Sequence, residues 1–413
     1  MTLWMRINHL LNTRRLNYAW IAGGALWFAW LISSVLGSGN MDLAGQVVGT
    51  DYLQFYAAGV SLRQGQSANL YNFAYQAQLE QSIAGSGLTS FHAFITLPFL
   101  AWLFVPLSHL PYIWSFIVWS GFSILFLWVS IRLLSIERPF KSFLWSLTWF
   151  PIFAAVSFGQ NSLLSLLIFC LAYGLWRKDK RLAAGLVSSL LLFKPQMVLG
   201  LGLLWLLDWR KSWKSLLGLT LGGMFFIGVS FWLLPDASRS YIDLARNFLP
   251  GMIYQDQFPL WHLDSLRGFW ILLFPGQVWL AESLSIILSI AGIVAYIFFW
   301  RTNRNNQDLL FAGAICLTIW ISPHAMIYDW SILLIPAILL WQARPGLQHF
   351  WKPLFALIWI TTFITAPLTL GQLKILPFAI QISIPILFWV YLIIYKLTKH
   401  SADKDIDLEM VQT

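Results

Sequence analysis

The sequence predicts an all-α polytopic membrane protein, and three observations support this fold class. Of the 413 residues, 58% are hydrophobic and only 10% are charged, whereas a soluble domain is usually about a quarter charged. Apolar runs recur along the whole chain at lengths that suit membrane helices. Alternation of apolar and polar residues with a period of two is absent, so helices are expected to satisfy the backbone polar groups in lipid.

The charge pattern and the two cysteines indicate which partners and cofactors to expect. The formal net charge is +9, and much of the Lys and Arg lies in short clusters between apolar runs, a pattern that encodes membrane topology. Cys170 and Cys316 both lie inside apolar runs, so the sequence shows neither a disulfide framework nor metal-ligand spacing. We expect no nucleic-acid partner, no cofactor and no metal, and we expect a monomer in contact with membrane lipids.

The first apolar run, residues 18–36, predicts a helix that leaves the cytoplasm. Arg14 and Arg15 precede this run and place its N-terminal side in the cytoplasm. A basic pair before an apolar run is also typical of a signal peptide. The run is long and lacks an A-x-A-like cleavage site, so an uncleaved membrane helix is expected.

Residues 37–111 then form the first outer loop. Thr50 or Asp51 can cap a helix over residues 52–64. Apolar residues at i, i+3, i+4 and i+7 predict that this helix lies on the membrane surface. These residues are Leu53, Tyr56, Ala57 and Val60.

Two further segments complete this outer loop. Asn72 can cap a short helix that ends near Gly85. Pro98 and Pro106 interrupt the apolar run 91–110. Because proline breaks the helical hydrogen-bond ladder, this run predicts a re-entrant or interfacial helix on the outer side.

Basic clusters determine the remaining crossings. Arg132–Lys141 and Arg177–Arg181 are both assigned to the cytoplasm, so an odd number of crossings separates the outer loop from Arg132. The run 182–207 carries Lys194-Pro195-Gln196 in its middle. Proline cannot continue the ladder, and lysine in an apolar run is costly, so two short helices are expected to meet there.

The other predicted helices span residues 112–134, 144–158, 163–176, 215–234, 279–300, 308–321, a segment ending before residue 344, 353–370 and 376–396. This gives about twelve crossings with both ends in the cytoplasm. Residues 1–413 form a single membrane domain, with a second outer segment at 235–277 and a cytoplasmic tail at 397–413.

Under this topology the polar groups that could carry chemistry share the outer side of the membrane. Carboxylates, a few cations and amides of this kind can activate a hydroxyl and neutralise a phosphate. The group comprises Asp51, Gln160, Asn161, Lys194, His262, Arg267, His324 and Asp329.

A structural interpretation remains open for most of these residues. Asp51 can be a helix cap, and Gly159-Gln160-Asn161 can be a tight turn. Lys194 can extend its ammonium group to the membrane surface. His324 can be an interfacial histidine, and both His262 and Arg267 can be solvated loop residues.

Four stretches, in this order, resemble one family. They are Thr50-Asp51-Tyr52 with Tyr56-Ala57-Ala58-Gly59 and Leu70-Tyr71; Phe158-Gly159-Gln160-Asn161; Gly185 with Lys194-Pro195-Gln196; and Ser322-Pro323-His324 with Tyr328-Asp329. Together they resemble the polyprenyl-phosphate-dependent glycosyltransferases of family 87, in the C-type superfamily. The resemblance covers most of the chain.

The resemblance implies the C-type fold, an active site on the extracytoplasmic side and a sugar donor carried on polyprenyl phosphate. The essential aspartate of the family corresponds to Asp51, and the residue after Ser-Pro corresponds to His324, so both are expected to be catalytic. Tyr56, in the first motif, is expected to bind substrate. The first outer loop lacks an adjacent acidic pair, which makes a carboxylate-bound metal unexpected.

The expected reaction transfers a hexose, mannose in the first instance, to a hydroxyl of a lipid or envelope glycan, with inversion. Asp51 acts as general base, and Lys194 with His324 or Arg267 stabilises the leaving phosphate. Gln160, Asn161, His262 and Asp329 complete the substrate site. The expected location is the bacterial inner membrane. Two alternatives remain: a lipid-linked substrate flippase or transporter, and a non-enzymatic scaffold. A transfer assay distinguishes an enzyme from both.

Overall fold

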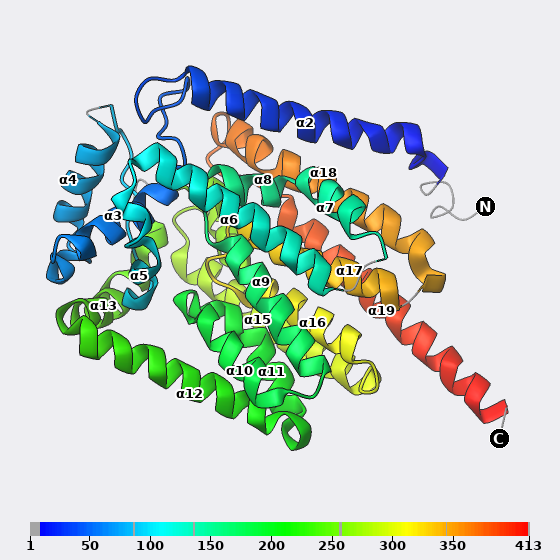
Figure 1. Ribbon diagram of the computed structural model, residues 1–413. Helices are drawn as coiled ribbons and strands as arrows, with labels where there is room; N and C mark the ends of the chain where they lie inside the picture. Colours follow the sequence, from blue (N-terminus) through cyan, green and yellow to red (C-terminus); the bar gives the residue numbers. More distant parts are fainter. Residues whose placement is uncertain (1–8, 86, 135–136, 256–257, 344, 412–413) are drawn as a thin grey trace.

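The computed structural model describes residues 9–85, 87–134, 137–255, 258–343 and 345–411. Across these residues the regular structure is helical, apart from one isolated antiparallel bridge between Met41 and Val47. The helices run roughly along one long axis (Figure 1). The predicted all-α polytopic fold class is therefore confirmed.

Five of the described helices are long and apolar enough to cross a membrane. They are α2 (Thr13–Leu36), α6 (Tyr112–Leu133), α12 (Trp209–Leu233), α15 (Val278–Thr302) and α18 (Gln348–Leu373). A sixth crossing is possible through α8 (Phe150–Ser157) and α9 (Ser162–Arg177), which form a bent pair with an angle of 119°.

The other predicted crossings coincide with apolar helices of 10–17 residues. These are α10 (Arg181–Ser188) with η4 (Ser189–Phe193), η5 (Pro195–Val198) with α11 (Leu199–Leu207), α16 (Gln307–Ile321), η8 (Ile327–Leu333) with α17 (Leu334–Ala343), and the first part of α19 (Ser383–Val411). About 20 residues are needed for a helix to span the apolar layer, so the count of twelve crossings stays a prediction.

The remaining elements are short and connect these helices. They are α3 (Tyr52–Arg63), η1 (Ser67–Asn69), α4 (Phe73–Ala84), η2 (Pro98–Leu100), α5 (Ala101–Phe104), η3 (Leu107–His109), α7 (Pro139–Leu147), α13 (Pro235–Asn247), η6 (Leu249–Tyr254), η7 (Leu260–His262), α14 (Leu266–Leu273) and η9 (Pro345–Leu347). Helices α3, α4, α5 and α13 gather at one end of the molecule, and the start of α2 and the end of α19 lie toward the other (Figure 1).

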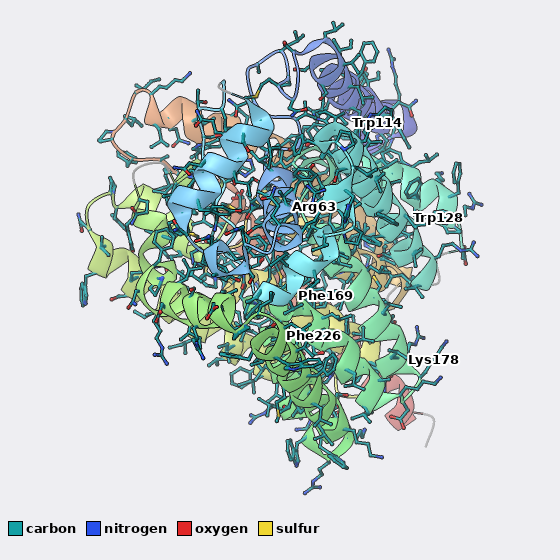
Figure 2. The ribbon with its side chains drawn as sticks, turned by 60° about the vertical axis from the view of Figure 1, so that its left-hand side comes forward. Arg63, Trp114, Trp128, Phe169, Lys178 and Phe226 are labelled. Carbon is teal, nitrogen blue, oxygen red and sulfur yellow. The ribbon has the colours of Figure 1, made fainter. Side chains whose placement is uncertain are left out.

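Large apolar side chains cover the outside of the long helices. Trp114 on α6 is 63% exposed, Trp232 on α12 is 80% exposed and Trp279 on α15 is 81% exposed. Figure 2 shows Trp114 at the periphery and Phe169 among the helices, where it is fully buried. An apolar exterior of this extent is typical of a surface that faces lipid.

The prediction that the helix over residues 52–64 lies on the membrane surface is wrong. Helix α3 forms where expected, but Leu53, Tyr56, Ala57 and Val60 are all buried. The opposite side is apolar too, and Phe55 stacks on Phe104 with ring centroids 5.0 Å apart. Because both sides can pack, neighbouring elements enclose the helix instead of leaving it on the membrane surface.

Two other predicted boundaries also differ. The single helix over residues 144–158 is divided into α7 and α8, because Trp149 is extended and Pro151 starts a new helix. The last helix begins at Ser383 rather than near residue 376.

Three predicted local features are confirmed. Asn72 caps α4 by accepting a hydrogen bond from the Tyr75 amide, and Gly85 follows the last residue. The apolar run 91–110 is interrupted as expected and forms only short helices, whereas its place on the outer side of the membrane stays a prediction. The run 182–207 is interrupted between η4 and η5, where Lys194 leaves helical geometry immediately before Pro195.

Candidate active site

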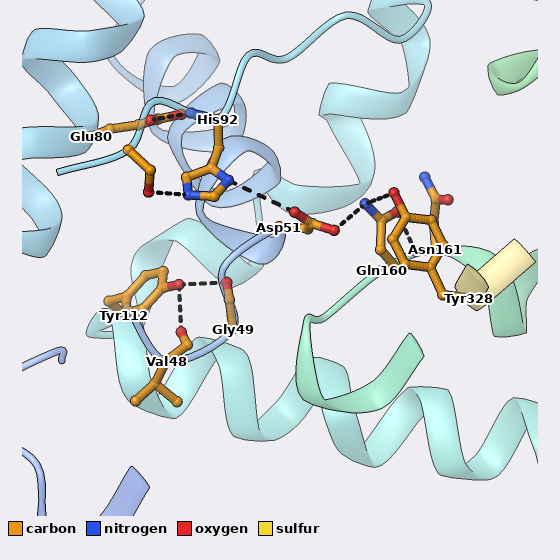
Figure 3. A network of polar contacts seen from close by, with 10 residues as sticks. Val48, Gly49, Asp51, Glu80, His92, Tyr112, Gln160, Asn161 and Tyr328 are labelled. Carbon is orange, nitrogen blue, oxygen red and sulfur yellow. Dashed lines mark hydrogen bonds and ion pairs between the residues drawn. The ribbon is translucent and has the colours of Figure 1, made fainter. Parts of the chain in front are cut away.

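Asp51 lies at the start of α3 but does not cap it. No hydrogen bond joins its side chain to the first turn of the helix. Instead, the Gln160 amide donates to Asp51 Oδ2 at 2.9 Å, and His92 Nδ1 lies 3.7 Å from Asp51 Oδ1 (Figure 3). The carboxylate, 22% exposed, is therefore held between two side chains from distant parts of the sequence.

The backbone before Asp51 is fixed by α6. The Tyr112 hydroxyl donates to the carbonyl oxygens of Val48 and Gly49, at 2.8 and 3.0 Å (Figure 3). Gly49 has a φ of +72°, and a Cβ there would lie 2.5 Å from the Phe116 ring. Only glycine fits this close approach, so the turn presents Asp51 at a defined position.

The Gly159-Gln160-Asn161 stretch is the turn between α8 and α9. The Gln160 amide group donates to Asp51 and, at 3.2 Å, to the Tyr328 hydroxyl. The Gly159 carbonyl accepts from the Trp119 indole at 2.9 Å. The stretch is therefore both a tight turn and the element that brings an amide to Asp51.

Gly159→Ala is expected to destabilise the protein by at least about 1–2 kcal/mol, because a side chain in this backbone region is strained. Gly159 has a φ of +71°, and an added Cβ would lie 2.5 Å from Tyr52 Cβ. Thermal unfolding in one detergent measures the change. Gly121→Ala in α6 is the matched control, since a Cβ there meets nothing within 4 Å. Equal melting temperatures for the two variants would contradict the argument.

His92 and Glu80 also belong to the site, and sequence reasoning did not select either. The His92 backbone amide donates to Glu80 Oε2 at 3.0 Å, and His92 Nε2 lies 2.9 Å from Ser90 Oγ. Glu80 is fully buried, and burial raises the pKa of its carboxyl to about 7, against the hydrogen bond and charge of His92. The i, i+4 spacing of Gln76 and Glu80 on α4 was the available signal, since both lie on its buried face.

Lys194 and Asp329 form a buried ion pair next to Tyr328. Lys194 Nζ lies 2.7 Å from Asp329 Oδ1, which also accepts from the Ser162 hydroxyl at 2.8 Å. The Met326 backbone amide donates to Asp329 Oδ2 at 3.2 Å. Lys194 also lies 5.2 Å from the centroid of the Tyr328 ring. Its charge is therefore balanced by Asp329, while Tyr328 connects the pair to Gln160.

His262 and Asn161 lie beside the same network. The His262 ring packs against Phe158, with centroids 5.5 Å apart. Burial lowers the pKa of His262, and the nearby Asp51 charge only partly offsets this effect. Asn161 is fully buried, and neither atom of its side-chain amide has a hydrogen-bond partner among the described residues. A buried amide without partners is costly, which makes Asn161 a candidate for contact with a bound substrate.

Arg267 and His324 belong to a second cluster. Arg267 Nε donates to Glu282 Oε1 at 2.7 Å, and its guanidinium lies 5.6 Å from the Tyr254 ring centroid. Burial and the charge of Arg267 lower the pKa of His324 to about 4, against the opposing charge of Glu282. The electrostatic interactions thus associate His324 with Arg267 rather than with Asp51.

Tyr56 faces a different direction. Its hydroxyl donates to the Leu110 carbonyl at 2.8 Å, and its ring packs against Tyr52 and Tyr112. The structure therefore places Tyr56 in the packing of α3, and the predicted substrate contact of Tyr56 has no support in these interactions.

The arrangement around Asp51 can perform acid–base chemistry. A carboxylate with an amide donor at one oxygen and an imidazole 3.7 Å from the other is oriented to accept a proton from a hydroxyl group that approaches it. A lysine ammonium lies beyond Tyr328, and it has three donor hydrogens, of which Asp329 accepts one. Among the described residues, no group of three or more His, Cys, Asp or Glu side chains is arranged to hold a metal ion.

Comparison with known proteins assigns the chain to a family. The profile of glycosyltransferase family 87 matches residues 94–323, more than half of the chain. Gln160, Lys194 and Arg267 lie inside the matched region, whereas Asp51 and His92 precede it. No curated protein and no solved structure matches the chain significantly. The match confirms the resemblance drawn from the four sequence stretches. The chain is a membrane enzyme that acts on a sugar donor and an acceptor, and it belongs to glycosyltransferase family 87.

Proposed function

We propose that this enzyme transfers a hexose, with mannose the first candidate, from a polyprenyl-phosphate donor to a hydroxyl of a lipid or envelope glycan. The observation that carries the proposal is the Asp51 carboxylate, which is held by Gln160 and His92 where elements distant in sequence meet. Asp51 removes the proton of the acceptor hydroxyl while that oxygen attacks the anomeric carbon. The bond to the phosphate breaks from the opposite face, so the product has the inverted configuration.

The leaving phosphate gains negative charge as the bond breaks. Lys194 supports it, because two donor hydrogens remain after the contact with Asp329 and because buried donors act strongly in a site of low dielectric. Asn161 supplies an unpaired amide for a sugar or acceptor hydroxyl. Arg267 and His324 form a second anchoring region for the acceptor or the phosphate, and the neutral His324 ring offers Nδ1 as a buried unpaired atom.

The position of the site in the membrane follows the charge pattern. Basic clusters between the helices support a site on the extracytoplasmic side of the bacterial inner membrane, under the positive-inside rule. A donor with a prenyl tail fits this location, because the tail stays in the bilayer while the sugar phosphate reaches the interface. The family membership favours transfer over transport without chemistry.

Synthetic polyprenyl-phosphate sugars test the reaction. The purified chain in lipid nanodiscs is expected to form a glycoside from the mannose donor and a lipid or glycan acceptor, and nuclear magnetic resonance is expected to show inversion at the anomeric carbon. A product with retained configuration would contradict direct attack by the acceptor. Absence of transfer from every polyprenyl-phosphate sugar, combined with transfer from a nucleotide sugar, would overturn the donor assignment.

A further inference from the structure

The His92 imidazole lies between Asp51 and Ser90. Its Nδ1 lies 3.7 Å from Asp51 Oδ1, and its Nε2 lies 2.9 Å from Ser90 Oγ. The ring is mostly enclosed, since only 16% of the His92 side chain is exposed, whereas Thr89 and Phe91 are exposed. Catalytic hydrogen bonds in ligand-free structures are often long and shorten in the complex, so 3.7 Å suits a contact that completes on binding.

The backbone of this segment is fixed by two side chains of α4. Glu80 Oε2 accepts from the His92 amide at 3.0 Å, and Gln76 Oε1 accepts from the Phe94 amide at 2.9 Å. Gln76 also donates to the Leu70 carbonyl at 2.6 Å. A helix therefore orients the extended segment that carries His92, as a rigid support does for a reacting group.

The groups that face this pair come from several elements. Glu80 on α4 lies behind His92, Gln160 and Tyr328 lie on the far side of Asp51, and His262 completes the surroundings of Asp51. Of these neighbours, burial raises the pKa of the Glu80 carboxyl to about 7 and lowers the pKa of His262. His92 is therefore the residue whose charge can compensate Asp51 within this set.

We propose that His92 is a positioning residue for the reaction: it acts through Asp51, donating from Nδ1 to Oδ1 while Gln160 donates to Oδ2. The two donors fix the plane of the carboxylate and leave its remaining lone pairs toward the acceptor hydroxyl. This inference rests on the proposed role of Asp51 as general base.

The protonation of His92 gives the proposal a pH signature. Burial alone would lower the pKa of His92, but the hydrogen bond and charge of Asp51 and the charge of Glu80 outweigh it, so the pKa of His92 is raised. The positive charge is therefore present at acid pH and is lost as the pH rises through this raised value. The contact between His92 Nδ1 and Asp51 therefore carries a positive charge at acid pH and loses it at alkaline pH.

The variants His92→Asn and His92→Gln distinguish the hydrogen bond that orients Asp51 from the positive charge of His92. Asparagine can place its side-chain nitrogen near the position of Nδ1, whereas glutamine places it near Nε2, on the Ser90 side. His92→Ala and His92→Gln are expected to lower kcat about 10–100-fold, the range for residues that orient a functional group through a hydrogen bond. His92→Asn is expected to recover most of kcat, because its amide nitrogen can donate to Asp51 Oδ1 as Nδ1 does, and to lose the change in kcat that accompanies the titration of His92. His109→Asn, at an exposed position in η3, is the matched control.

Steady-state kinetics from acid to alkaline pH, with melting temperatures measured in parallel, decide the outcome. Equal activity of the asparagine and glutamine variants, or a pH profile identical to that of the wild type in every folded variant, would overturn the role of His92. Asp51→Asn is measured in the same series. If Asp51→Asn is inactive while the His92 variants behave as wild type, only this inference fails; if Asp51→Asn retains activity, the proposed function itself fails.

Discussion

Asp51→Asn is expected to lower kcat by about 10²–10⁴-fold, the usual contribution of a general base. The amide keeps the shape of the carboxylate, and its oxygen can still accept from Gln160, so substrate binding is expected to change little. The amide cannot take up a proton at neutral pH, so attack by the acceptor oxygen loses its assistance. Initial rates in nanodiscs at saturating donor and acceptor measure the loss, and KM is expected to stay near the wild-type value.

The matched control for this change is Asp243→Asn. Asp243 is exposed on α13, in the second outer segment, so its replacement removes one negative charge without touching the Asp51 contacts. Its kcat and KM are expected to equal those of the wild type. An Asp51→Asn protein that retains wild-type kcat would show that another group removes the proton, and a large rise in KM alone would point to a binding role.

Lys194→Met is expected to destabilise the protein by about 3–5 kcal/mol, the cost of breaking a buried ion pair by removing one partner. The reason is that Asp329, only 2% exposed, would keep a buried negative charge supported by Ser162 and Met326 alone. Thermal unfolding in one detergent measures the loss, with Lys178→Met in the exposed basic cluster after α9 as the matched control. Equal melting temperatures of the Lys194→Met and Lys178→Met variants would contradict a structural role for the ion pair.

The double variant Lys194→Met with Asp329→Asn separates stability from catalysis. Removing both charges leaves no unpaired ion. The free energy of unfolding of the double variant is therefore expected to exceed that of Lys194→Met alone by about 1–3 kcal/mol, the range of interaction energies between residues in contact. Its kcat is still expected to be reduced, because no ammonium group remains to support the leaving phosphate. A double variant that is both stable and fully active would exclude Lys194 from the reaction.

Sequence reasoning selected most of the polar residues that the structure brings together. Three features were each unusual in their surroundings: an acidic residue at the start of a short amphipathic segment, an amide pair in a turn, and a lysine before a proline inside an apolar run. These features predicted that Asp51, Gln160 and Lys194 share a region, and the contacts through Tyr328 connect all three. The apolar runs likewise predicted the fold class, because lipid forces helical hydrogen bonding.

The contacts of His92 could not be predicted from the sequence in the same way. They depend on residues 90–94 folding back onto α4 through the side chains of Gln76 and Glu80, and extended segments of this kind have no periodic signature in sequence. The burial of α3 was missed for a different reason. Tyr52, Phe55 and Ala58 make the second side of the helix as apolar as the first, so the spacing of Leu53 and Val60 did not predict which side faces the protein.

The attachment of residues 90–94 to α4 ties the geometry of the site to a short helix. The Glu80 and Gln76 side chains accept hydrogen bonds from the His92 and Phe94 backbone amides. Both side chains are buried, so their positions are set by the packing of α4. The segment beside the base therefore takes its geometry from α4 rather than from the long membrane helices.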